Sequence, residues 1–158
     1  MSHSLCRSIF HIVFSTKERC RLIPKASLDT TFAYIAGVAR NHQIRVFSVG
    51  GMQDHVHALV ELPTEMAPAD AVRTLKCNSS RWLRDSVRLF NWQQGYAAFS
   101  VSPSQTDRVV RYIARQAEHH ARYSFEDELR AILKAAGMAM PIGLESVAPE
   151  GALDLQGR

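Results

Sequence analysis

Two histidines separated by one residue, His55 and His57, are the side chains in this sequence best suited to chemistry. They lie in residues 52–62, MQDHVHALVEL, whose alternating pattern predicts a half-buried strand. Side chains two positions apart on a strand point to the same face, so the two imidazoles project side by side. Such a pair can bind one metal ion or one phosphate group. A metal site needs a third ligand, however, and catalysis needs a nucleophile.

A second candidate group surrounds Tyr112. Residues 105–121 have a helical pattern in which Val109 and Ile113 lie on the packing side. Tyr112 and Gln116 are one helical turn apart and share a face. Arginines recur beside them, namely Arg108, Arg111, Arg115 and Arg122. Because a guanidinium group binds phosphate oxygens in a forked geometry, a tyrosine hydroxyl in this setting suits a phosphate substrate.

The elements that position these residues follow from the hydrophobic pattern. The expected strands are residues 8–15, 44–49, 52–62 and 96–101. The expected helices are residues 26–43, 68–87, 105–121 and 124–137. Gly50 and Gly51 are expected to break the second strand and form a tight reversal, because glycine adopts positive φ angles readily.

This order of elements predicts an α+β fold of the ferredoxin-like, split βαβ type. Such a fold has a four-stranded antiparallel sheet with helices on one face, here followed by C-terminal helices that carry Tyr112. Val56 and Ala58 alternate with the histidines and must face the covering helices. His55 and His57 are therefore expected on the opposite, open face, where a ligand or another element can reach them.

Length and composition suit one domain, expected over residues 1–140, with residues 141–158 as a flexible tail. No apolar run is long enough for a membrane span, and no secretory signal is expected. The cysteines Cys6, Cys20 and Cys77 lack the spacing of a disulfide framework or a zinc ribbon, so the cytoplasm is the expected location. The net charge of +4 is compatible with nucleic-acid binding but is weak evidence alone.

Several segments together resemble a known family. Asp54-His55-Val56-His57 and the later YIARQAEHH of residues 112–120 resemble the single-tyrosine HUH transposases of the insertion-sequence-200 type (IS200/IS605). The resemblance covers about residues 5–137. The His-x-His motif alone is weak evidence, whereas the ordered set is specific. Further matching segments are FHIVFSTK at 10–17, Gly50-Gly51, Leu75-Lys76, SSRWL at 79–83 and WQQGYAAFSVS at 92–102.

The resemblance implies a transposase that cleaves and rejoins single-stranded DNA through a covalent 5′-phosphotyrosine. Carried over to this chain, His55, His57 and Gln116 would bind a divalent metal, Mg²⁺ or Mn²⁺, and Tyr112 would be the nucleophile. The resemblance also implies a homodimer that recognises imperfect hairpins near the element ends. In such a dimer the tyrosine helix of one subunit can complete the histidine site of the other.

Other polar residues have less certain assignments. His119 and His120 could ligate a metal, but a structural or DNA-contact role is favoured for both. Asp54 is expected to point away from His55. For His11, a position near the site and a position on the surface are both open. Tyr123 is a less favoured nucleophile. The expected DNA contacts are Arg108, Arg111, Arg115, Lys76, Arg81 and His120.

Two alternative functions remain open. One is a nucleic-acid-binding protein without enzymatic activity, either a domesticated or inactive relative or an unrelated ferredoxin-like RNA binder. The intact set of His55, His57, Tyr112 and Gln116 argues against it, and RNA-binding sheets usually display aromatic side chains on their open face. The other is a rolling-circle or conjugative nickase, a class that is usually longer and often carries two tyrosines.

Overall fold

The computed structural model describes residues 3–141. The chain divides into two compact units, Met1–Glu118 and His119–Arg158. The first unit contains β1 (Ile9–Ser15), α1 (Leu28–Asn41), β2 (Arg45–Met52), β3 (His55–Glu61), α2 (Pro68–Leu83), β4 (Ala97–Ser100) and α3 (Thr106–Ala114). No helix within residues 3–141 is long and apolar enough to cross a membrane.

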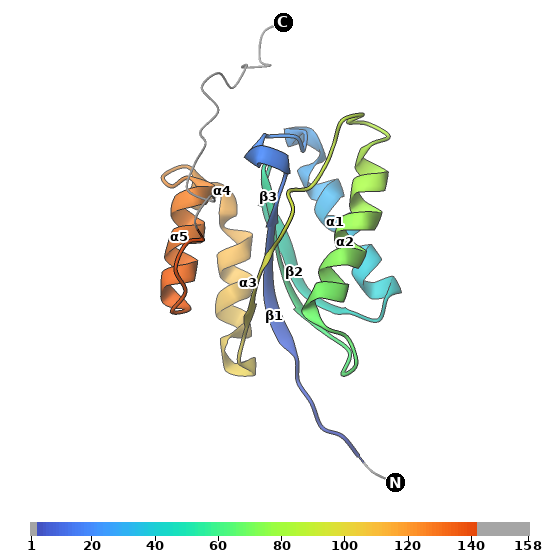
Figure 1. Cartoon of the computed structure of the whole chain (residues 1–158), viewed down its shortest axis with the longest axis vertical. Coiled ribbons are helices and arrows are strands. Elements are labelled where there is room, and N and C mark those ends of the chain that lie inside the picture. The colour runs from blue at the N-terminus through green and yellow to red at the C-terminus, as the bar shows by residue number, and fades with distance from the viewer. Residues whose placement is uncertain (1–2, 142–158) are drawn as a thin grey trace, which may run out of the picture. The chain divides into compact units, whose positions relative to one another are not determined.

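The four strands form one sheet in the order β2-β3-β1-β4, and every neighbouring pair is antiparallel. Helices α1 and α2 lie on one side of this sheet and α3 lies on the other (Figure 1). The strand order and the two crossover helices confirm the predicted split βαβ fold.

The main core lies between the sheet and helices α1 and α2. Ile12 and Phe14 of β1 and Val56 and Val60 of β3 are buried there. They alternate with residues that face the other way, as the pattern of period two predicted. The helices contribute Ile35, Ala39, Val72 and Leu75 to the same cluster.

The opposite face of the sheet is covered rather than open. His55 and His57 point away from α1 and α2 as predicted, but both side chains are fully buried. Helix α3 packs on this face, where Ile113 joins Leu59 and Ile9 in a second apolar cluster. The expectation of an open face is therefore corrected, and the physical reason is that amphipathic α3 must bury its apolar side.

The two glycines do not form the reversal that the sequence suggested. Gly50 and Gly51 lie inside β2, where Gly50 pairs with His57, and the turn falls at residues 53–54. A Cβ atom on Gly50 would lie 2.8 Å from Cγ2 of Ile113 and 2.9 Å from its carbonyl oxygen. Gly50 thus permits the close approach of α3 to the histidine strand.

Exchange of Gly50 for alanine is expected to displace α3 and destabilise the fold. The added methyl group would meet the Ile113 backbone, which cannot move without the helix, so the free energy of unfolding should fall by about 1–3 kcal/mol. Thermal unfolding measures this loss of stability. Gly37→Ala is the matched control, because a Cβ atom there meets nothing within 4 Å. Equal behaviour of the two variants would contradict the packing role of Gly50.

The predicted helix over residues 105–121 is two helices. Helix α3 ends at Ala114 and α4 covers Gln116–His120. Arg115 departs from helical geometry with φ of −101° and ψ of 19°. Its N–H donates to the carbonyl of Tyr112 at 3.2 Å, a three-residue spacing that tightens the last turn. Tyr112 and Gln116 therefore belong to different helices.

The described part of the second unit contains α5 (Phe125–Ala135). Ser124 and Asp127 form a capping box: the Ser124 hydroxyl accepts from the Asp127 N–H, and the carboxylate accepts from the Ser124 N–H. The hydrogen bond from the Ser124 side chain lowers the pKa of Asp127. The predicted tail lies outside the described residues beyond Pro141.

Candidate active site

His55 is held through its Nδ1 atom. The Asp54 carboxylate oxygen lies 2.7 Å from Nδ1, and Oε1 of Gln116 lies 3.0 Å from Nε2. The expectation that Asp54 points away is therefore wrong, because Asp54 lies in the turn before β3 and its carboxylate contacts the imidazole of His55. When Nδ1–H donates to the carboxylate, a neutral imidazole carries its lone pair on Nε2, toward the amide oxygen. The Nε2 atom of His55 and the Oε1 atom of Gln116 then both present lone pairs, and two lone pairs side by side suit a bound cation.

His57 is also held through Nδ1, by a residue whose position the sequence left open. Nε2 of His11 lies 2.8 Å from Nδ1 of His57, and the two rings stack with centroids 5.0 Å apart. His11 is buried and lies on the histidine face because it precedes Val13, the partner of His57, by two residues on β1. Metal-binding histidines commonly have their second ring nitrogen hydrogen-bonded in this way, which fixes the ring orientation.

Tyr112 lies beside these histidines in the same chain. Its ring centroid is 5.7 Å from that of His57 and 6.2 Å from that of His11, both in edge-on geometry. Gln116 is buried, and its Oε1 atom lies 3.0 Å from Nε2 of His55. The structure thus brings together the four residues proposed for catalysis and metal binding, although the helix that carries Tyr112 and Gln116 is broken between them.

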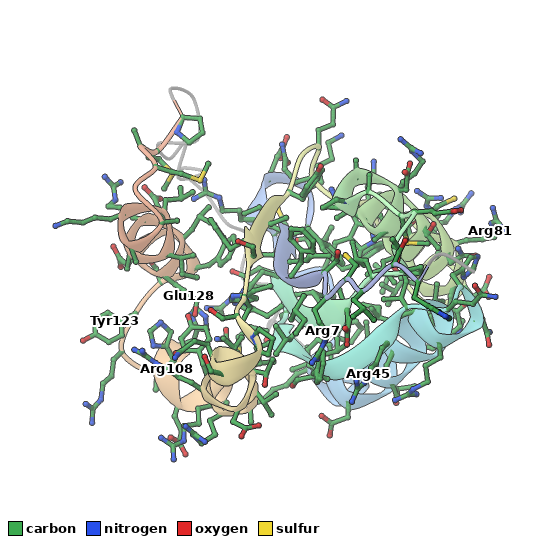
Figure 2. The ribbon with its side chains drawn as sticks, turned by 90° about the horizontal axis from the view of Figure 1, so that it is seen from below. Arg7, Arg45, Arg81, Arg108, Tyr123 and Glu128 are labelled. Atoms are coloured by element: carbon green, nitrogen blue, oxygen red, sulfur yellow. The ribbon has the colours of Figure 1, made fainter. Side chains whose placement is uncertain are left out.

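The residues expected to contact DNA do not form one surface. Arg108, Arg111 and Arg115 are exposed on and just after α3. Arg81 is exposed on α2, on the other side of the sheet, and Figure 2 shows Arg81 and Arg108 far apart. Among the residues expected to contact DNA, Arg108 and Arg111 lie on the same helix as Tyr112.

Lys76 has a structural position. Its ammonium group donates to the carbonyl oxygens of Gln93 at 2.7 Å and Gly95 at 2.5 Å. Burial lowers the pKa of this lysine. Lys76 therefore holds the segment before β4, together with buried Trp92, whose indole N–H donates to the Ser79 hydroxyl at 3.0 Å. Trp92 is part of the main core.

The rival tyrosine, Tyr123, lies in the second unit. It is 54% exposed and its ring stacks on His119, with centroids 5.1 Å apart. Nδ1 of His120 lies 2.8 Å from the Tyr123 carbonyl oxygen, and the His120 side chain is 8% exposed. His120 therefore offers little surface for the DNA contact expected of it.

Comparison with known protein families identifies this chain as a tyrosine transposase. The model of the family described as "Transposase IS200 like" matches residues 4–116, so this chain belongs to that family. Its members are DNA-cleaving and strand-transferring enzymes of DNA recombination, and they are generally metal-dependent.

Individual relatives agree with this assignment. The chain is 24% identical over 115 residues to the ISDra2 transposase TnpA of Deinococcus radiodurans, a match that covers 68% of this chain and 82% of the relative. A crystal structure described as a putative transposase from Deinococcus radiodurans has a TM-score of 0.59 at 19% identity, covering 73% of this chain and 95% of that one. A REP-associated tyrosine transposase bound to a REP hairpin has a TM-score of 0.56 at 15% identity, with coverage of 76% and 74%.

Proposed function

We propose that this transposase cleaves and rejoins single-stranded DNA at the ends of a mobile element through a 5′-phosphotyrosine on Tyr112. The observation that carries the proposal is the convergence of Tyr112 on His57 and of Gln116 on His55 within one chain. A protein that only bound DNA would have no need of a tyrosine placed against two buried, oriented imidazoles.

The residues present fit a divalent metal. His55 and His57 would supply imidazole nitrogens and Gln116 an amide oxygen, with Asp54 and His11 holding the two rings. A mixed nitrogen and oxygen set suits Mn²⁺ better than Mg²⁺, which prefers oxygen ligands alone. When bound, the ion supplies Lewis-acid polarisation of the scissile phosphate and stabilises negative charge on its oxygens.

Tyr112 performs the covalent step. Its phenolic oxygen attacks the phosphorus atom, the new O–P bond forms, and the bond from phosphorus to the 3′-oxygen breaks. The phenol loses its proton and the leaving oxygen takes one up, which yields a 5′-phosphotyrosine and a free 3′-hydroxyl. Attack by a different 3′-hydroxyl reverses the step and joins new strands without ATP, because the ester keeps the bond energy.

The phenol needs help to ionise, because the pKa of an ordinary tyrosine is about 10. Arg108, Arg111 and Arg115 bring three positive charges to the segment that carries Tyr112. Opposite charge nearby favours the ionised form of an acid. The same guanidinium groups are suited to bind the phosphates that flank the cleavage point.

The proposed partner is single-stranded DNA folded into an imperfect hairpin. A structural neighbour is described in complex with a REP hairpin, and the exposed arginines of α3 suit a phosphate backbone. The protein is proposed to act as a homodimer in the cytoplasm. The presence of Tyr112 and both histidines in one chain supports action in cis.

Incubation of the protein with hairpin DNA from the element ends and Mn²⁺ or Mg²⁺ tests this function. The expected product is a covalent protein–DNA adduct carrying the 3′-terminal label of the cleaved strand, together with a fragment that ends in a 3′-hydroxyl. Hairpin binding without any adduct would instead identify the protein as an inactive relative that only binds DNA.

Exchange of His11 for phenylalanine is expected to weaken metal binding. The variant keeps an aromatic ring but loses the hydrogen bond to Nδ1 of His57, and loss of such a partner typically costs about 10–100-fold in metal affinity. The half-saturating Mn²⁺ concentration for cleavage should rise by this factor, and excess Mn²⁺ should restore most of the rate. His42→Phe is the control, because this histidine lies at the end of α1 and bonds to Val38. An unchanged Mn²⁺ dependence would contradict the positioning role.

A further inference from the structure

A second group of metal-ligating side chains lies entirely in the second unit. Oε2 of Glu128 is 3.3 Å from Nε2 of His119, and Oε1 of Glu128 is 3.3 Å from Nε2 of His120. The ligand atoms of the three residues all lie within 4.8 Å of one another. The Glu128 side chain is 1% exposed and comes from α5 (Figure 2).

The hydrogen bonding of His120 requires either a proton or a metal ion between its Nε2 atom and Glu128. Nδ1 of His120 lies 2.8 Å from the Tyr123 carbonyl oxygen, which can only accept, so Nδ1 carries a hydrogen. In a neutral imidazole the lone pair is then on Nε2, where it faces the Glu128 carboxylate. Two lone pairs at this distance repel each other. Either a proton on Nε2 or a metal ion between the two groups removes the repulsion.

The distances favour the metal ion. A charge-assisted hydrogen bond between imidazolium and carboxylate has a nitrogen–oxygen distance of about 2.7–2.9 Å. Two ligand atoms bound to one tetrahedral ion at about 2.0–2.2 Å are separated by roughly 3.4 Å. Both nitrogen–oxygen distances here are 3.3 Å. The spacing therefore matches two atoms that share an ion more closely than a direct hydrogen bond.

The surroundings of the group also suit ligation. A buried carboxylate is costly unless it is paired or coordinates a metal. The Tyr123 carbonyl holds the second nitrogen of His120, the arrangement that orients metal-binding histidines. The capping box of Ser124 and Asp127 fixes the start of α5, one turn before Glu128. The carboxylate is thus presented from a rigid helix.

We propose that His119, His120 and Glu128 form a second metal site, which binds a divalent transition-metal ion such as Zn²⁺. Two imidazoles and one carboxylate are a common ligand set for this ion and leave a fourth position for water. The bound ion fastens the end of α4 to α5. His119 and His120 belong to this candidate group alone, and the proposal does not depend on the DNA-cleaving function proposed for Tyr112.

Titration of the full chain with Zn²⁺ against a chromophoric chelator tests the proposal. The wild-type chain is expected to bind two equivalents, the His55→Ala/His57→Ala chain one, and the Glu128→Gln chain one. Glutamine keeps the shape of Glu128 but lacks its charge. With Co²⁺ as a spectroscopic substitute, the intense visible bands of a four-coordinate ion should persist in the His55→Ala/His57→Ala chain and disappear in the Glu128→Gln chain.

Glu126→Gln is the matched control, because this acid on the same helix pairs with Arg130 and should leave both equivalents in place. No bound equivalent in the His55→Ala/His57→Ala chain, or two in the Glu128→Gln chain, would overturn the proposal. If Glu128→Gln fails to fold, the His55→Ala/His57→Ala chain still decides, since it binds one four-coordinate Co²⁺ or none. Loss of DNA cleavage with the second equivalent intact would count only against the function proposed for Tyr112.

Discussion

The Tyr112→Phe variant is expected to form no covalent DNA adduct while it binds hairpin DNA as tightly as the wild-type chain. Phenylalanine removes only the phenolic oxygen, which is the atom that would attack phosphorus. The ring remains to make the edge-on contacts with His57 and His11, so the packing of α3 is preserved. Denaturing gels with DNA labelled at its 3′ end measure the adduct, and mobility shifts measure binding.

Tyr123→Phe is the matched control for this experiment. Tyr123 is the exposed tyrosine whose ring stacks on His119, and its exchange should leave the adduct unchanged. Adduct formation by Tyr112→Phe at the wild-type level would show that another residue is the nucleophile. A parallel loss of hairpin binding would show instead that the hydroxyl serves recognition.

His57→Ala is expected to slow single-turnover cleavage by about 1,000-fold. The metal ion supplies several kcal/mol of stabilisation to the transition state, and each 1.4 kcal/mol changes the rate about tenfold. The variant removes one of the two imidazole ligands and also the hydrogen-bond partner of His11. Chelation of the metal from the wild-type chain should give a similar loss, whereas His42→Ala should leave the rate unchanged.

Mixing two inactive chains separates catalysis in cis from catalysis in trans. Tyr112 and His57 face each other within one chain. A mixture of Tyr112→Phe and His57→Ala proteins is therefore expected to remain inactive. Recovery of adduct to a substantial fraction of the wild-type level would mean that α3 of one subunit serves the histidines of its partner.

Much of the fold could be predicted because its signals are local. The alternation around Val56 and Val60 fixed which side of β3 meets α1 and α2, and the order of elements defined the sheet. The role of Gly50 could not be predicted in this way. Glycine is suited both to a reversal and to close packing, and only the approach of Ile113, far away in sequence, distinguishes the two.

The sequence could propose the residues of the candidate site but not the residues that hold their rings in place. His55, His57, Tyr112 and Gln116 follow from spacing and from the family resemblance, and the structure places them together. The bond from His11 to His57 depends on how β1 and β3 align, and a single strand carries no such information.

The surface contacts were harder to predict because charge alone does not reveal burial. Lys76 follows the basic pattern of α2, yet its ammonium group is occupied by two backbone carbonyls. His120 follows the arginine-rich segment, yet its ring is directed to Tyr123 and Glu128. The Lys76 contacts join segments that are 17 and 19 residues apart, so they depend on tertiary packing.

Peptide mass spectrometry of the trapped adduct tests the central claim most directly. The protein is incubated with hairpin DNA and Mn²⁺, digested with protease and nuclease, and searched for the nucleotide that remains attached. We expect a 5′-linked nucleotide on the peptide that contains Tyr112, and on no other tyrosine. A nucleotide on Tyr123, or linkage through its 3′-phosphate, would contradict the account.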